Sequence, residues 1–168
     1  EAGGVLDRLG GAAWQARKAR LKDRIRDMAT DLIRVATART LESSPRIVPS
    51  EGLYEEFSAR FPYTETDDQA LAIEDTLADL GGTRPMDRLI CGDVGFGKTE
   101  VALRAAFAAV LEGRQVAVVV PTTLLCRQHF QTFRERFRDY PVKIEQISRL
   151  VAAKRVGEVK AGLRDGTV

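Results

Sequence analysis

The N-terminal part of the chain carries apolar residues at a helical period. Residues 12–42 contain no Gly or Pro and are rich in Ala, Arg, Leu and Lys, which favour helix. In this segment apolar side chains recur mostly three or four positions apart, at Trp14, Leu21, Ile25, Met28, Leu32 and Val35. This spacing places one apolar stripe along a helix of about eight turns. A Ser-Ser-Pro sequence at 43–45 ends it, so we predict a first domain, residues 1–44, built around a long amphipathic α-helix.

The pattern changes after this boundary. Residues 45–168 alternate between segments of helical period and short, continuous apolar runs. We expect helices at 53–61, 66–80, 98–112, 122–138 and 152–163, and strands at 89–91, 116–120 and 142–147. The Val-rich run at 116–120 is typical of a strand covered on both faces of a parallel sheet. This alternation predicts a second domain, residues 45–168, with an α/β fold and a doubly wound parallel sheet.

Composition narrows the class of protein. The 168 residues carry a formal net charge of +2 and are 44% hydrophobic, which is typical of a globular chain. Residues 1–50 and 121–168 are basic and residues 51–120 are acidic; basic ends attract polyanions, although solvated helix faces explain the same pattern. Two cysteines, Cys91 and Cys126, form no metal-binding motif and fit a reducing compartment. With no apolar run of membrane-spanning length and no leader sequence, we expect a cytoplasmic protein without a membrane partner.

One motif carries specific chemistry. Residues 92–99 read GDVGFGKT and match the phosphate-loop pattern G-x-x-x-x-G-K-[ST]. Glycines let the backbone approach phosphates, and the loop's N–H groups with the following helix N-terminus form a nest for an anion. Lys98 places a positive charge on the outer phosphates, and the Thr99 hydroxyl helps to hold Mg²⁺. An apolar run before the loop and a helix after it support nucleotide binding over a glycine-rich turn without a ligand.

Gln69 has two possible roles that compete for its side chain. Thr66 and Gln69 have the spacing of a capping box at a helix start. The alternative is that Gln69 hydrogen-bonds the edge of an adenine while Phe61 or Tyr63 packs on the ring. The residues alone leave both open.

A threonine pair follows the Val-rich run. Thr122 and Thr123 stand at the start of an expected helix, after Pro121. They either cap that helix or bind a nucleic-acid phosphate through their hydroxyl and backbone N–H groups.

Taken together, these motifs resemble a known family. The segments are FPYTETDDQ at 61–69, MDRLICGDVGFGKTE at 86–100 and PTTLLCRQH at 121–129. In this order they are similar to the bacterial transcription-repair coupling factors (Mfd) and, second best, to RecG. Phe96 and Glu100 favour the first family, and WQARKAR at 14–20 is similar to its long helix before the motor. Cys126 departs from the family, which more often has Ala there.

The resemblance implies a superfamily 2 double-stranded DNA translocase. In this family two RecA-like lobes hydrolyse ATP in the cleft between them, displace stalled RNA polymerase and recruit excision-repair proteins. Carried onto this sequence, the ATP site comprises Phe61, Gln69, Gly92, Asp93, Val94, Gly95, Phe96, Gly97, Lys98, Thr99 and Glu100. Lys98 and Thr99 would act in catalysis, Thr99 with Mg²⁺, and Thr122 and Thr123 would contact DNA.

Some parts of such a motor have no counterpart in this sequence. Phosphoryl transfer needs an acidic pair at the end of a later strand and arginines from a second lobe, and no apolar run ending in Asp-Glu follows Thr99. We therefore expect the first part of a RecA-like P-loop lobe with an incomplete parallel sheet, which binds ATP weakly and hydrolyses none at a useful rate. The alternatives are a RecG-like branch-migration helicase lobe, which the second resemblance implies, and a nucleotide-regulated protein-binding module whose N-terminal helix docks in a partner's groove.

Overall fold

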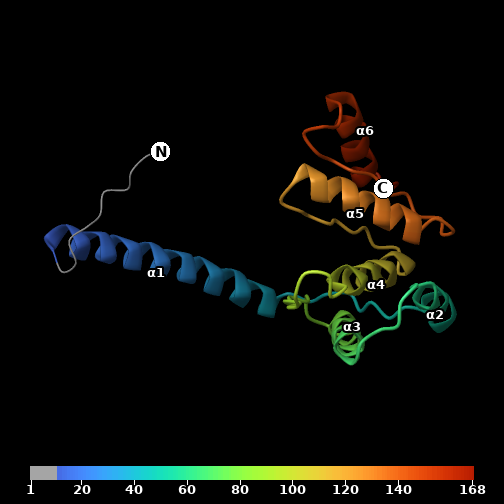
Figure 1. Ribbon diagram of the computed structural model, residues 1–168, viewed down its shortest axis with the longest axis horizontal. Helices are drawn as coiled ribbons and strands as arrows, with labels where there is room; N and C mark the ends of the chain where they lie inside the picture. The colour runs from blue at the N-terminus through green and yellow to red at the C-terminus, as the bar shows by residue number, and fades with distance from the viewer. Residues whose placement is uncertain (1–10) are drawn as a thin grey trace. The chain divides into compact units, whose positions relative to one another are not determined.

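The computed structural model describes residues 11–168, so residues 1–10 of the first expected domain lie outside the described part. The chain divides after Ser44 into two compact units, the second being Pro45–Val168. Figure 1 shows the helices of each unit. Each unit is described by itself.

The described part of the first unit is one long helix. Helix α1 spans Ala12–Leu41, follows Gly11 and ends where the N–H of Glu42 donates to the Arg39 carbonyl oxygen. No residue of α1 is buried, and its apolar stripe is exposed throughout, from 37% at Trp14 to 71% at Leu32. The expected long helix is therefore present, with its apolar stripe exposed.

The second unit is built from helices around an aromatic core. Its helices are α2 (Glu51–Ala59), α3 (Asp67–Leu80), α4 (Lys98–Leu111), α5 (Thr123–Arg136) and α6 (Ala153–Arg164). The rings of Phe57 and Phe107 are fully buried and stack with centroids 4.0 Å apart, and Phe137 packs edge-on against both. Leu103, Ala106 and Phe133 complete this cluster. Helix α4 lies against α3 and α2 (Figure 1) and contributes half of the buried residues of the described chain.

The expected parallel sheet is not seen in the described residues 11–168. In residues 11–168 no segment is a β-strand, and the runs 89–91, 116–120 and 142–147 have no backbone hydrogen bonds to one another. Leu89 and Val119 are 86% and 92% exposed. A parallel strand obtains partners for its N–H and C=O groups only from neighbouring strands. Here the core is made by side chains of α2, α4 and α5 with Phe137. The runs 89–91 and 116–120 stay largely at the surface, whereas Val142 and Ile144 of the third run pack against the core. The sheet part of the predicted fold is therefore not shown and stays a prediction.

Candidate functional site

The phosphate loop reaches the start of α4 through left-handed glycines. Gly97, the N-cap residue of α4, has φ 72°, and Gly95 has φ 87°. A residue with a Cβ is disfavoured in this region by about 1–2 kcal/mol. The path of the loop therefore explains why glycine occupies these two positions.

Lys98 folds back over the loop that precedes it. Its Nζ donates hydrogen bonds to the carbonyl oxygens of Gly92, at 2.5 Å, and Asp93, at 2.6 Å. The loop is closed by a second contact, in which the N–H of Phe96 donates to the same Asp93 oxygen at 3.3 Å. The ammonium group is thus held beside the residues that the motif assigns to phosphate.

The first turn of α4 offers donors to an anion. Gly97 has no side chain to cap the helix, and Thr99, two positions further along the chain, is half-buried. The first N–H groups of a helix have no partner within the helix, and its dipole is positive at this end. With the ammonium of Lys98, this is the donor set that a phosphate chain requires.

Gln69 joins α3 to the phosphate loop. Its Oε1 accepts from the N–H of Thr66 at 2.9 Å, and its own N–H donates to Thr66 Oγ1 at 3.2 Å, so the capping box is formed. Its Nε2 donates to the carbonyl oxygen of Phe96 at 2.8 Å. Both ends of the amide are engaged, so reading an adenine edge requires release of one of these bonds. The adenine contact stays a prediction.

Phe61, the other residue assigned to adenine, is half-buried and lies two positions after the last residue of α2. Its ring packs edge-on against Tyr63 with centroids 5.5 Å apart, and Tyr63 itself is 74% exposed. The guanidinium carbon of Arg136 lies 6.0 Å from the Phe61 ring centre. The Phe61 ring therefore packs against Tyr63 and lies near Arg136, while Tyr63 itself is largely exposed to solvent.

The exposed tip of the loop is apolar. Val94 is fully exposed and Phe96 is 61% exposed. Asp93 is also exposed, and its backbone oxygen rather than its carboxylate takes part in the contacts described above. The loop thus presents the side chains of Asp93, Val94 and Phe96 to solvent, while Lys98 contacts its backbone.

Glu100, in the first turn of α4, differs from the other assigned nucleotide residues in being buried. Its side chain is 5% exposed, and its Oε1 accepts from Arg104 Nε at 3.0 Å and from Arg136 Nη2 at 2.8 Å. Its backbone N–H donates to the Gly97 oxygen at 2.8 Å. The carboxylate is therefore engaged inside the protein, and this placement favours a packing role over direct contact with a nucleotide.

The motifs in the sequence predict no role for Arg104 and Arg136, which pair with Glu100. Arg104 also pairs with Glu65, in the segment before α3. Burial lowers the pKa of the Arg104 guanidinium, but its hydrogen bonds to Glu100 and Glu65 outweigh that effect and raise the pKa overall. The i,i+4 spacing of Glu100 and Arg104 indicates an ion pair on one face of a helix. Arg136 is 36 positions from Glu100, so no local pattern in the sequence predicts their contact.

Thr122 caps α5. Its Oγ1 accepts from the N–H of Leu125 at 3.2 Å, and Thr123, the first helical residue, is half-buried. The capping alternative is therefore realised at Thr122, and a DNA contact by either threonine stays a prediction.

The described residues 11–168 contain no cluster of three or more His, Cys, Asp or Glu that could hold a metal ion. None of the helices in this part of the chain has the length and apolar character needed to cross a membrane.

Comparison with known proteins decides the family. Residues 66–163 match the model of the DEAD/DEAH box helicase family. The chain belongs to this family. The match runs from the cap of α3 through the phosphate loop to α6, so it contains most of the candidate site.

The relatives of the chain confirm the resemblance to transcription-repair coupling factors. Over 97% of its length it is 48% identical to the transcription-repair-coupling factor of Myxococcus xanthus and 45% identical to that of Bacillus subtilis. It is 48% identical to that of Rickettsia bellii, again over 97% of the chain. The chain spans only 14–15% of the length of these proteins.

A solved structure is also similar. RecG bound to a three-way DNA junction superposes with a TM-score of 0.71 at 30% identity, covering 78% of this chain and 18% of that one. Together with the helicase family match, this likeness supports a RecA-like lobe.

Proposed function

We propose that the chain is the ATP-binding part of an ATP-dependent translocase of double-stranded DNA that displaces stalled RNA polymerase and couples transcription to excision repair. The observation that carries the proposal is the phosphate loop, in which Lys98 lies over the backbone of Gly92 and Asp93 at the start of α4. The family match and the transcription-repair-coupling relatives support the motor class.

The residues of the loop fit a nucleotide with Mg²⁺. The N–H groups of the first turn of α4 would hold the phosphates, and Lys98 would exchange its two carbonyl partners for phosphate oxygens. The Thr99 hydroxyl would face the Mg²⁺, as the motif implies. Mg·ATP, when bound, supplies the phosphoryl group whose transfer to water drives movement. Gln69 and Phe61 would select the base.

Hydrolysis requires more than these residues. An acidic pair that holds Mg²⁺ and positions water, and arginines from a second lobe, are needed for phosphoryl transfer. Because the sequence after Thr99 contains no apolar run ending in Asp-Glu, we expect this chain alone to turn over ATP far below ~1 s⁻¹.

Calorimetric titration with Mg·ATP tests the nucleotide site. Lys98→Ala removes the ammonium and is expected to weaken binding by about tenfold or more, the equivalent of about 1.4 kcal/mol. Lys154→Ala, at an exposed position of α6, is the matched control and should leave the affinity unchanged. Equal Mg·ATP affinities for Lys98→Ala and the wild-type chain would contradict the proposal.

A second titration tests the DNA contact. Thr122→Asp keeps an oxygen that can cap α5 but adds a negative charge, so we expect weaker binding to a fluorescent DNA duplex with unchanged stability. Thr122→Ala removes the cap and adds no charge. A DNA affinity that is the same for Thr122→Asp, Thr122→Ala and the wild type would remove Thr122 from the DNA contacts.

The apolar stripe of α1 supports a second candidate function. The helix carries one row of apolar residues along its length, including Ile25 and Leu32, which suits a helix that docks in the groove of a partner protein. In that case the nucleotide site would be regulatory. Substitutions on this stripe separate the two candidates.

A further inference from the structure

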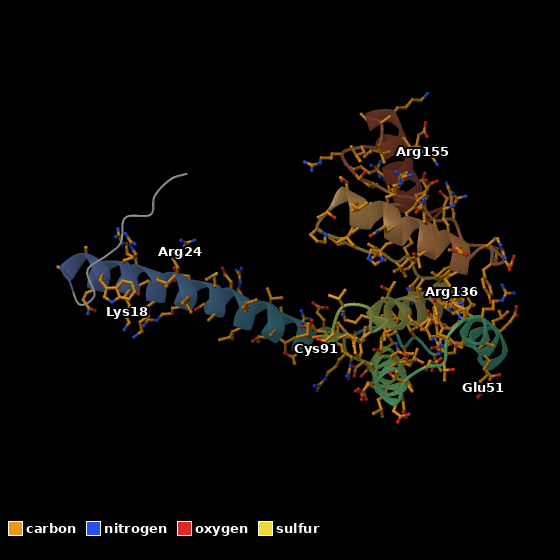
Figure 2. All side chains as sticks on the ribbon, in the orientation of Figure 1. Lys18, Arg24, Glu51, Cys91, Arg136 and Arg155 are labelled. Atoms are coloured by element: carbon orange, nitrogen blue, oxygen red, sulfur yellow. The ribbon has the colours of Figure 1, made fainter. Side chains whose placement is uncertain are left out.

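A cluster of four charged side chains is centred on Glu100, the residue that follows the phosphate loop. It consists of Glu100 and Arg104 from α4, Arg136 from α5 and Glu65 from the segment before α3. The side chains of Glu100, Arg104 and Arg136 are 5%, 6% and 12% exposed. Figure 2 labels Arg136, at the end of α5.

The cluster touches both halves of the candidate nucleotide site. Glu100 follows Thr99 directly and belongs to the first turn of α4, the turn that would hold the phosphates. Arg136 binds that carboxylate at 2.8 Å, and its guanidinium carbon lies 4.4 Å from the ring centre of Phe57 and 6.0 Å from that of Phe61. One side chain therefore connects the end of the phosphate loop to the aromatic residue assigned to the base.

A second connection runs through Arg104. It pairs with Glu100 on one side and with Glu65 on the other. Glu65 precedes Thr66, whose cap includes the Gln69 amide. The base-facing residues Phe61 and Gln69 are thus each linked to Glu100 through an arginine.

Stability alone does not account for this arrangement. A buried ion pair contributes little net stability compared with well-packed apolar residues, because desolvation of the charges offsets their attraction. What the cluster does provide is fixed geometry. Arg136 uses a planar guanidinium to bind a carboxylate and to lie over an aromatic ring, which the point charge of a lysine does poorly.

We propose that Arg136, through Glu100, is a positioning residue that fixes the spacing between the phosphate-holding turn and the base-facing residues, and so sets the preference for adenine nucleotides. The inference rests on the proposed function, because it requires a nucleotide at the phosphate loop. Tripolyphosphate needs only the phosphate-holding turn, whereas discrimination between ATP and GTP needs both halves in register.

The experiment compares three ligands, Mg·ATP, Mg·GTP and Mg·tripolyphosphate, by calorimetric titration of the 168-residue chain. Arg136→Met keeps an apolar contact with Phe57 and leaves Glu100 paired with Arg104. Arg134→Met is the matched control on the same helix, since Arg134 is exposed and lies over Phe130 instead of the cluster. Glu100→Gln combined with Arg136→Met removes both charges, so this second variant leaves no unpaired buried carboxylate.

Arg136→Met is expected to lower the ratio of ATP to GTP affinity by about fivefold or more while tripolyphosphate affinity stays within about twofold, a split that corresponds to at least about one kcal/mol acting on the base alone. The double variant should behave in the same way, and Arg134→Met should match the wild type. If the cluster has only a structural role, the substitutions should weaken the binding of all three ligands together or of none of them.

The inference is overturned if the ATP-to-GTP ratio is unchanged in both cluster variants, or if the wild-type chain itself shows no preference. Failure of the proposed function looks different, because then the wild-type chain binds neither Mg·ATP nor Mg·tripolyphosphate, and the inference falls with it.

Discussion

The side-chain amide of Gln69 donates a hydrogen bond to the carbonyl oxygen of Phe96 at 2.8 Å, which ties the first turn of α3 to the phosphate loop. The next residue, Gly97, lies so close to the same amide that a Cβ at this position would collide with Gln69 Nε2. Glycine at 97 therefore meets two requirements, a left-handed φ of 72° and the close approach of Gln69.

Gly97→Ala is expected to damage both the fold and nucleotide binding. The left-handed backbone alone costs about 1–2 kcal/mol for a residue with a Cβ, and the collision displaces the Gln69 amide in addition. We expect a lower free energy of unfolding in urea and about tenfold or weaker binding of Mg·ATP.

Gly113→Ala is the matched control for this substitution. Gly113 has φ 68°, and a Cβ there would meet nothing within 4 Å, so this variant carries the backbone cost without the collision. If Gly97→Ala and Gly113→Ala lose the same unfolding free energy and bind Mg·ATP equally, the Gln69 contact is unimportant.

The aromatic core predicts a large effect at one position. Phe107 is 1% exposed and stacks on Phe57, so Phe107→Ala is expected to lower the free energy of unfolding by about 3–5 kcal/mol. Leu124→Ala, where the side chain is 65% exposed, should change it by less than about 0.5 kcal/mol.

Circular dichroism in urea is the measurement for these core variants, since the one tryptophan of the chain, Trp14, lies in α1. A loss below about 1 kcal/mol for Phe107→Ala would contradict the packing seen around this ring, because full-ring deletions in a close-packed core cost several times more.

The helices could be predicted because their signals are local. Thr66 and Thr122 occupy capping positions, and both accept the hydrogen bond expected of a cap. Gly113 lies just beyond the end of α4 and has the left-handed φ typical of a residue that follows a helix. Period, caps and stops lie within a few residues of one another, so one sequence is enough to read them.

The sheet and the charge cluster lie beyond such local signals. An apolar run such as 116–120 indicates a need for burial, but a strand also needs a neighbour at the right register, which the run itself does not specify. Likewise, Arg136 meets Glu100 across 36 positions. The contact of Gln69 could not be predicted for another reason. Its acceptor is the backbone oxygen of Phe96, and every residue has such an oxygen.

An ion pair at the end of α3 predicts a dependence of stability on acid pH. Arg88 Nε donates to Asp79 Oδ2 at 2.6 Å, and this hydrogen bond lowers the pKa of the Asp79 carboxyl below its ordinary value of 3.8. A pKa lowered in the folded state means that the unfolded state binds more protons at acid pH. The contribution is therefore present above about pH 4 and is lost as the pH falls through the folded pKa.

Arg88→Gln tests this dependence. The difference in unfolding free energy between wild type and variant should be largest near neutral pH and shrink as the pH is lowered below about 4. Arg84→Gln, at an exposed position of the same loop, should show no such change. A difference for Arg88→Gln that is constant from pH 7 to 3, measured by urea unfolding at each pH, would rule out the Asp79 contact as its source.

The last prediction concerns the apolar stripe of α1. Ile25 and Leu32 are 53% and 71% exposed, and no residue of α1 is buried. If the stripe serves a partner protein, the double variant Ile25→Asp, Leu32→Asp should move the urea midpoint of the unit Pro45–Val168 by no more than the equivalent of about 0.5 kcal/mol. Val101→Asp places a charge at a position of α4 that is 4% exposed and serves as the positive control for unfolding.

Circular dichroism together with Mg·ATP titration distinguishes the two interpretations of this helix. If the double variant keeps the fold and the nucleotide affinity, the stripe is free to serve a partner protein, as the second candidate function requires. If the variant unfolds the unit Pro45–Val168, the helix instead acts as an intramolecular strut. A strut stabilises a domain only through the apolar surface that it buries, so the two interpretations predict opposite effects of the double variant on the stability of this unit.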